Sequence, residues 1–409
     1  MGLFTKKKSV LNGRDDFDRV VRAFLREFSP PGSSVEELPE EDALRVGGTV
    51  TNLTNLRRRW TELEAEDRLP WLAGSVREFL EQATDPSRAD MPFDSGCLRA
   101  IIRSRSAMEA SSIRFAADGD GFRDSSSIPL QPLAGDLCWV LAEDSEHTLS
   151  VVNDGRLDEL AMTFDEALAH AFHNLSATPV EAWSAVDGRV FSPIGDDYVV
   201  SRAFLPGALD ALPLEGDLVA FVTNRRSCVI AAAADDDGVR MAAEYCQTLT
   251  GSADQVSFEP IVGRPGRWDA LVLPSDHPAH TPVASLTTID RLGSHQVQHE
   301  ALSRQLGDSL FVAQYKALRS PSGRAVSYCT WSIGVPTLLP ETDLTAFFIH
   351  DGVNEPSSFM VPSAVMVRIV GHLLEPTRHH PVRWRALTSP SEAEIDALRA
   401  EQIDPTRYD

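Results

Sequence analysis

A six-residue motif that occurs twice, each time before an apolar run, is the feature that most constrains the fold. The sequence reads Pro-Leu-Ala-Gly-Asp-Leu over 132–137 and Pro-Leu-Glu-Gly-Asp-Leu over 213–218, 81 positions later. After each copy come an apolar run, a polar turn, a second apolar run and a helical pattern, in the same order. Short apolar runs bounded by turn residues are typical of strands. The sequence therefore predicts two ββα units that begin with the same motif.

The Gly-Asp pair inside the motif has a structural explanation. Gly135 and Gly216 supply a free φ angle, and Asp136 and Asp217 supply a local side-chain acceptor, which together form a tight turn before a half-buried strand. An alternative is that duplicated units face one another and present Asp136 and Asp217 as a paired carboxylate site. We expect the turn.

The rest of the chain divides into regions of different character. Residues 1–90 are predicted to be a helical region that packs on the next domain, because apolar residues between Phe17 and Phe28 recur at three- and four-residue steps. Residues 91–250 hold the duplicated ββα units, expected on one mixed sheet. Thr163 and Glu166 have the spacing of a capping box at the first helix of these units. Residues 251–409 form a third domain, and the predicted class is α+β.

The second half of the third region is predicted to contain three strands followed by two helices. Strands are predicted over 310–318, 325–333 and 344–349, with a hairpin turn over 320–323 that includes Ser322. Helices are predicted over 362–374 and 390–402, the last one capped by Ser391.

The charge balance excludes classes of partner. The formal net charge is -22, which repels nucleic acid and anionic lipid. Two basic clusters, Lys6–Lys8 and Arg57–Arg59, are interpreted as a solvated tail and a charged helix face, with a polyanion site as the alternative. We expect a protein partner, no nucleic acid and no membrane.

The cysteines and the first residues point to the cytoplasm. Five cysteines are spread along the chain without a Cys-x-x-Cys pair, which disfavours a disulfide framework or a thiolate zinc site. The lysines near the start are followed by polar residues, so no signal peptide is predicted, and no window is apolar enough to span a bilayer.

Five short stretches of the sequence carry a resemblance to known proteins, at 51–56, 130–137, 166–175, 196–205 and 212–218. Together they resemble the YtpQ-like family of uncharacterised bacterial cytosolic proteins. The similarity covers roughly residues 10–250, in matching order and spacing, and implies a similar fold order and a cytosolic location. It implies no activity, cofactor or catalytic residue.

Sites for metals and cofactors are not apparent. His295 and His299 are spaced to lie on one helix face, but position 296 is Gln, so the pattern is not His-Glu-x-x-His. They remain weak metal candidates. The Asp-Gly-Asp-Gly run over 118–121 lacks the later ligands of a calcium loop. No nucleophile elbow, phosphate loop or dinucleotide motif is present, and no cofactor is expected.

Weak catalytic candidates lie on one loop. Asp276, His277 and His280 place a carboxylate beside two imidazoles, a combination that can transfer protons near neutral pH. We expect a non-enzymatic interaction or regulatory protein. The alternatives are an enzyme with an acid/base or hydrolytic site between the central and C-terminal domains, and an immunity-type binder of a basic partner.

Overall fold

The computed structural model describes most of the chain in two compact units. One comprises Met1–Leu98, Ala142–Ser150 and Asp158–Met162, and the other Arg99–Leu141, Val151–Leu157 and Thr163–Asp409. The predicted division into domains at residues 90 and 250 stays a prediction. Lys6–Lys8, the run over 118–121 and Ser322 lie outside the described residues, which are 14–39, 42–47, 49–84, 95–115, 128–145, 147–250, 255–320, 323–350 and 355–405.

The first unit packs three helices against a small antiparallel sheet of order β1-β2-β3. Its core holds Phe17 and Trp60, whose rings meet edge to face with centroids 5.9 Å apart. Arg57 pairs with Asp18 and Asp42, as expected of a charged helix face. The elements are α1 (Arg14–Phe28), β1 (Val35–Leu38), β2 (Ala43–Val46), β3 (Thr49–Asn52), α2 (Leu53–Glu62) and α3 (Arg68–Thr84).

The first ββα unit lies in a sheet of order β4-β6-β5, with β7 paired to β6. The Gly135-Asp136 turn joins β5 and β6 as an antiparallel hairpin. The capping box of Thr163 and Glu166 is present at the start of α6, which confirms that prediction. The elements are β4 (Leu98–Ser104), α4 (Arg105–Phe115), β5 (Leu130–Ala134), β6 (Leu137–Asp144), β7 (Leu149–Val151), α5 (Asp154–Glu159) and α6 (Phe164–Ser176).

The second ββα unit lies in a different sheet, of order β13-β12-β10-β11-β9-β8. Its helix α8 packs on β10 and β11 around Phe221, Val229 and Val239. The elements are β8 (Ala182–Val186), β9 (Val190–Ile194), α7 (Val199–Ala203), β10 (Leu218–Asn224), β11 (Ser227–Ala232), α8 (Asp236–Gln247), β12 (Ile261–Arg264) and β13 (Arg267–Ala270).

The expectation that both ββα units share one mixed sheet is wrong. Every pairing in the six-stranded sheet is antiparallel, and the first unit belongs to the other sheet. Parallel pairs occur instead in the C-terminal region, between β16 and β18 and between β14 and β17. The motif specifies a local turn before a strand, whereas sheet membership depends on pairing partners distant in sequence.

The C-terminal region contains two four-stranded sheets, of order β15-β16-β18-β19 and β14-β17-β21-β20. Its core holds Trp331, Phe347 and Val361. The predicted strand over 310–318 is two short strands in different sheets, while the β15–β16 hairpin and the Ser391 cap are as predicted. The elements are β14 (Phe311–Val312), β15 (Lys316–Arg319), β16 (Ala325–Ser332), β17 (Thr337–Pro340), β18 (Leu344–Ile349), β19 (Ser357–Pro362), α10 (Ser363–Val370), β20 (Leu374–Pro376), β21 (Arg383–Ala386) and α11 (Glu392–Ala400).

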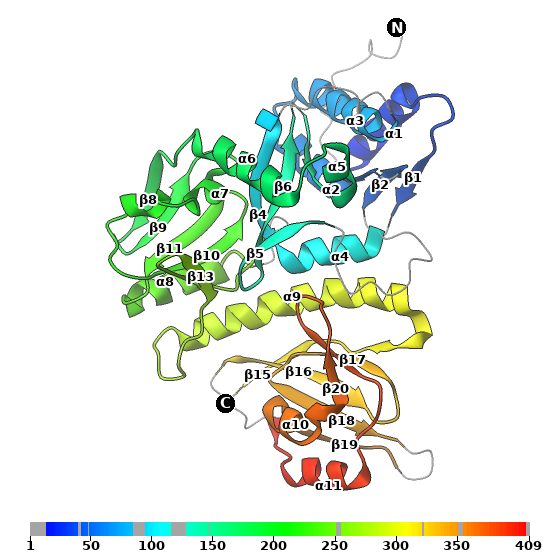
Figure 1. Cartoon of the computed structure of the whole chain (residues 1–409), viewed down its shortest axis with the longest axis vertical. Helices are drawn as coiled ribbons and strands as arrows, with labels where there is room; N and C mark the ends of the chain where they lie inside the picture. The colour runs from blue at the N-terminus through cyan, green and yellow to red at the C-terminus, as the bar shows by residue number, and fades with distance from the viewer. Residues whose placement is uncertain are drawn as a thin grey trace. The chain divides into compact units, whose positions relative to one another are not determined.

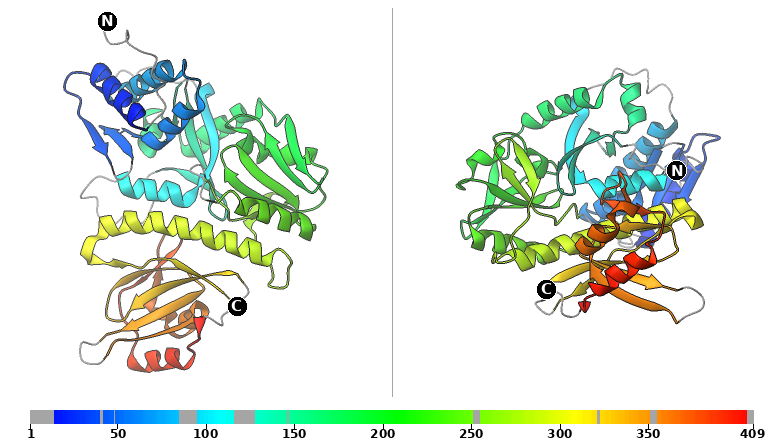
Figure 2. Two further views of the ribbon diagram at one scale, coloured as in Figure 1. Left: turned by 180° about the vertical axis from the view of Figure 1, so that it is seen from behind. Right: turned by 60° about the horizontal axis from the view of Figure 1, so that its bottom comes forward.

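A long helix, α9 (His280–Leu306), connects the parts of the second unit. It lies beside α4 on one side and along β15 and β16 on the other (Figure 1). The left view of Figure 2 shows the same arrangement from behind. None of the described helices is long and apolar enough to cross a membrane. The chain is an α+β protein, as predicted.

Candidate functional site

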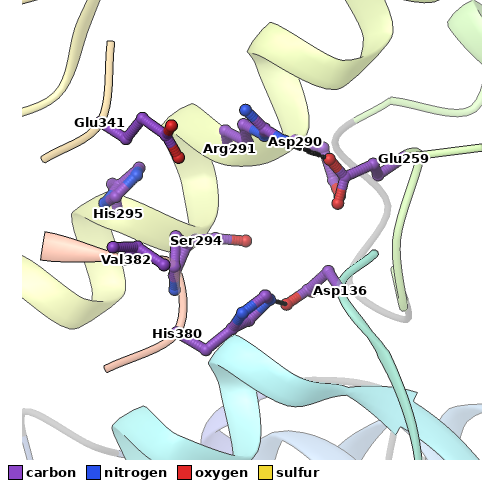
Figure 3. Close-up of a pocket in the computed structure, with 10 residues that line it drawn as sticks. Asp136, Glu259, Asp290, Arg291, Ser294, His295, Glu341, His380 and Val382 are labelled. Atoms are coloured by element: carbon purple, nitrogen blue, oxygen red, sulfur yellow. Dashed lines mark hydrogen bonds and ion pairs between the residues drawn. The ribbon is translucent and has the colours of Figure 1, made fainter. Parts of the chain in front are cut away.

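Four side chains on one face of α9 line a polar cavity in the second unit. Asp290, Arg291, Ser294 and His295 are spaced at i, i+1, i+4 and i+5, which places them on neighbouring positions of the helix surface. The cavity has a volume of about 80 Å³, and Figure 3 shows its wall. We call it the α9 cavity, and its lining residues are Asp136, Glu259, Asp290, Arg291, Ser294, His295, Glu341, His380, Pro381 and Val382.

Asp136 is the most extensively hydrogen-bonded carboxylate of the cavity. It accepts hydrogen bonds from Ser104 Oγ at 2.6 Å, from the Ser106 backbone N–H at 2.9 Å and from the Ser106 hydroxyl. Ser104 Oγ also accepts from the Ala107 N–H, so it caps α4. A carboxylate at a helix N-terminus is favoured by the free N–H groups and by the helix dipole. The Gly135-Asp136 turn thus brings a negative charge onto the start of α4.

His380 lies directly beside Asp136 in the cavity wall. Its Nε2 lies 3.0 Å from Asp136 Oδ1, as the dashed line in Figure 3 marks. The segment is held to α4 by Glu109, whose buried carboxylate contacts His379 Nδ1 at 2.6 Å and accepts the His380 backbone N–H at 2.7 Å. A hydrogen bond from Nε2 to Asp136 leaves Nδ1 as the nitrogen with the lone pair in neutral His380. Helix α4 therefore positions both members of this pair.

Two further carboxylates have their own partners. Glu259 Oε1 forms an ion pair with Arg291, 2.5 Å from Nη2 and 3.2 Å from Nε. Asp290 accepts from Gln255 at 2.7 Å and from Ser257 at 2.6 Å. Burial, and then the charge of Asp136, raise the pKa of Asp290 to about 6. The wall thus contains a carboxyl group that titrates close to neutral pH.

His295 contributes an open hydrogen-bonding position. The side chain is buried, stacks on Tyr315 with ring centroids 4.7 Å apart, and has no described partner at Nδ1. Burial, followed by the charges of Arg383 and Arg291, holds the pKa of His295 well below its ordinary value, so the ring is neutral at pH 7. A buried polar atom without a partner is costly unless something binds it.

Ser294 and Glu341 complete the wall. Figure 3 shows the Ser294 oxygen toward the middle of the cavity, and Glu341 on the same side as His295. Among the described residues, none donates a hydrogen bond to the Glu341 carboxylate or bonds to Ser294 Oγ. Glu341 is exposed, so the cavity opens to solvent there.

The weak catalytic candidates lie elsewhere. Asp276 is exposed in the turn before α9, and His280 is the first residue of that helix. His277 accepts the Ala279 N–H at Nδ1, 3.0 Å away, and its Nε2 lies 3.1 Å from Asp236. The structure therefore brings His277 to the start of α8, not to a joint site with Asp276, and none of the three lines the α9 cavity.

The residues of the other predicted sites also lie apart in the structure. His295 lines the α9 cavity, but His299 does not, and the described part of the chain has no group of three metal-ligating side chains. Gly135 and Gly216 both have positive φ, +54° and +77°, as the turn prediction requires. Asp136 and Asp217 are not brought together, because Asp217 lies near Arg264 beside the six-stranded sheet.

Most residues of the cavity were not predicted as a site. The sequence predicts Asp136 as a turn residue, with a carboxylate pair with Asp217 as the alternative, and His380 belongs to a His379-His380 pair without a recognisable metal spacing. Glu259, Asp290 and Arg291 belong to no motif. The one available signal was the run of polar residues at helical spacing on α9, between the apolar positions Leu286 and Leu302.

Comparison with known proteins found no match. No protein family, curated protein or solved structure is significantly similar to the chain.

Proposed function

We propose that the protein is a non-enzymatic regulatory protein that binds a small polar ligand in the α9 cavity. The observation that carries the proposal is that segments distant in sequence together line the cavity. Its side chains come from segments between Asp136 and Val382, each held by its own hydrogen bonds, while Ser294, His295 Nδ1 and Glu341 stay open to a ligand. A ligand there would join α9, the Gly135-Asp136 turn and the 380–382 segment, and so stabilise their arrangement.

Binding fits the geometry better than catalysis. The three buried carboxylates are committed to serines, to Arg291 and to Gln255, so none is a free base. Ser294 has no hydrogen-bonded histidine among the described residues, which a serine nucleophile needs for activation.

A thermal-shift screen of small polar metabolites tests the proposal. At a ligand concentration of 100 times the Kd, the folded state should gain about 2.7 kcal/mol, which is a measurable rise in Tm. Ser294→Leu fills the cavity and should abolish the rise. Ser303→Leu, on the same helix but not in the wall, is the matched control. If no compound raises Tm, or if Ser294→Leu leaves the rise unchanged, the proposal is wrong.

The regulatory output would be contact with a protein partner, and β8 is the surface that favours it. This strand is an edge of the six-stranded sheet, contains no charged residue, and exposes Val186 by 54%. Unprotected edge strands pair with extended segments of other chains. An acidic protein would favour a basic partner, in keeping with an immunity-type binder. Ser184→Lys should weaken binding of such a partner, and unchanged affinity would exclude this edge.

An acid/base enzyme remains the second proposal, because of one observation. The contact of 3.0 Å between His380 and Asp136 orients an imidazole at a cavity wall, as in many proton-transfer sites. His380→Gln should then abolish turnover while leaving ligand binding largely intact. Binding without turnover in the wild type would support the regulatory proposal instead.

Kinship with the YtpQ-like family over residues 10–250 and a cytoplasmic location are also proposals. The structure of a YtpQ-like protein would test the kinship. A sheet order other than β4-β6-β5 at the matching segment would contradict it. Cell fractionation would test the second.

A further inference from the structure

The open positions of the α9 cavity share one chemical property, because they accept hydrogen bonds. The Glu341 carboxylate is an acceptor only, and Ser294 Oγ accepts through its lone pairs. Gln298 raises the pKa of His295, as an acceptor of a ring N–H does, and since Nδ1 has no partner, that N–H is the one at Nε2. The neutral His295 ring therefore presents a lone pair at Nδ1.

The charges of the wall favour the same kind of ligand. Four carboxylates, those of Asp136, Glu259, Asp290 and Glu341, line the cavity with one guanidinium, that of Arg291. The charge of the buried Arg383 behind His295 also acts on this ring, so the carboxylates outnumber the guanidinium groups by four to two. The Arg291 charge is already engaged, since Nε and Nη2 both contact Glu259. The Glu341 carboxylate helps to raise the pKa of Arg291 through its charge but makes no hydrogen bond or ion-pair contact among the described residues. The cavity is thus electrostatically suited to a cation and unsuited to an anion.

The size of the cavity limits the group that enters it. A volume of about 80 Å³ holds about five to eight water molecules at roughly 10–15 Å³ each. This is enough for a small head group, and the opening at Glu341 lets the remainder of a longer ligand stay outside. The described residues provide no cluster for a bare metal ion.

We infer that the α9 cavity binds a primary ammonium group, which donates hydrogen bonds to Glu341, Ser294 and His295. An ammonium group has three N–H donors and no acceptor, and so it complements a wall of acceptors with excess negative charge. The inference rests on the proposed function, because it specifies the ligand of the same cavity. The group belongs either to a free small amine or to the side chain of a lysine on another protein.

Titrations of the full chain with matched probes test the inference. The probes are ethylammonium, acetate and acetamide, followed by 1,4-diaminobutane and Nα-acetyl-lysine amide to separate the two sources. Binding is followed by the imidazole ¹⁵N signals of His295 and His380 in histidine-labelled protein. We expect ethylammonium to shift the His295 signal, and acetate and acetamide to leave it unchanged at equal concentration. Tighter binding of the diamine indicates a free amine, and tighter binding of the lysine derivative indicates a lysine side chain.

Variants that leave the core intact make the test specific. Glu341→Gln should weaken ethylammonium binding about tenfold, the loss expected for one charge-assisted hydrogen bond. Glu375→Gln removes an exposed carboxylate of β20 outside the wall and should change nothing. Equal binding of acetate and ethylammonium, or full affinity in Glu341→Gln, overturns the inference.

The experiments distinguish failure of the ammonium inference from failure of the proposed function. If a neutral or anionic compound binds and Ser294→Leu prevents it, the α9 cavity is a ligand site and only the ammonium inference is wrong. If no probe or screened metabolite binds, both are wrong.

Discussion

The two copies of the Gly-Asp motif have the same local chemistry and very different surroundings. Asp136 is 5% exposed and accepts four hydrogen bonds from Ser104, Ser106 and His380. The Asp217 side chain is 45% exposed, and its nearest cation is Arg264 at 3.8 Å. A motif that makes a turn can therefore also supply a buried charge to a cavity, depending on what the fold places beside it.

The difference has a physical origin in the elements that precede each motif. The first copy joins two paired strands, β5 and β6, and points its carboxylate at the N-terminus of α4. The second copy has no strand before it, and a bend leads directly into β10. Equal turn chemistry thus gives a buried site only where a helix start is available to stabilise the charge.

The comparison predicts its largest effect for removal of the two carboxylates. Asp136→Ala leaves the donors of Ser104, Ser106 and His380 without an acceptor, so the free energy of unfolding should fall by about 3–5 kcal/mol. Asp217→Ala should change it by less than about 0.5 kcal/mol, as at an exposed site. Urea denaturation at pH 7 measures both. Equal losses in the two variants would show that burial does not distinguish the copies.

The next effect concerns Asp290, whose raised pKa depends partly on Asp136. Its pKa is about 6 in the folded protein against a reference of 3.8, so the folded state holds this proton more tightly than the unfolded chain. The cost of burying the charge is therefore fully present at pH 7.5 and is relieved as pH falls through 6 toward 3.8. Relative to Asp290→Asn, the wild type should gain about 2 kcal/mol between pH 7.5 and pH 4.5.

Urea denaturation across this pH range checks the prediction. A second measurement follows the titration of Asp290 itself, with Asp217→Asn as the control for Asp136→Asn. Replacing Asp136 by Asn removes one of the charges that raise the pKa, so the carboxyl resonance of Asp290 should titrate at lower pH. The same substitution at Asp217 should leave the titration unchanged. A wild type whose stability relative to Asp290→Asn is independent of pH would contradict the assignment of a raised pKa.

A smaller difference is expected at the glycines of the two turns. Both have positive φ, so an alanine costs about 1 kcal/mol at either position. At Gly135 the new Cβ would also lie 3.0 Å from Glu259 Oε2, whereas at Gly216 it meets nothing within 4 Å. Gly135→Ala should therefore lower the free energy of unfolding by about 2 kcal/mol, and Gly216→Ala by about 1 kcal/mol. Thermal denaturation distinguishes them, and a greater loss at Gly216 would reverse the comparison.

The smallest effect on the free energy of unfolding is expected at the N-caps of α6 and α8, the helices of the two ββα units. Thr163 caps α6 in a capping box, and Asp235 caps α8 through the Gly238 N–H. Either change to Ala should cost about 1 kcal/mol. Asp235 also pairs with Arg189, so Asp235→Ala should lower the free energy of unfolding more than Thr163→Ala does. The losses caused by Thr163→Ala and by Arg189→Ala should add in the double variant. Double-mutant denaturation measures this, and a non-additive result would show that the two caps are coupled.

Local features of the fold were predictable from the sequence because their causes are local. Apolar spacing predicted α1 near residues 15–28, and the capping boxes at Thr163 and Ser391 are present in the structure. The arrangement of strands was not predictable in the same way. The stretch 310–318 is mostly apolar, but Phe311 pairs with Thr337 and Lys316 with Tyr328, so it forms two strands in different sheets.

The cavity was less predictable than the fold, since its residues interact over long distances in the sequence. Asp136 gained its environment from serines about 30 positions earlier and from His380. Glu259 and Arg291 are ordinary charged residues until the fold pairs them. His277 shows the converse, because its proximity to Asp276 in sequence indicated a joint site that its contact with Asp236 replaces.

The contacts of Asp136 also imply an order of assembly. Its bonds to Ser104 and Ser106 close loops of 32 and 30 residues, whereas its contact with His380 closes a loop of 244 residues. The longer closure costs about 2 kcal/mol more in chain entropy. We therefore expect the turn to dock on α4 early in folding and His380 to arrive late. The Asp136 carboxylate would then first stabilise the start of α4 and later hold His380 in place.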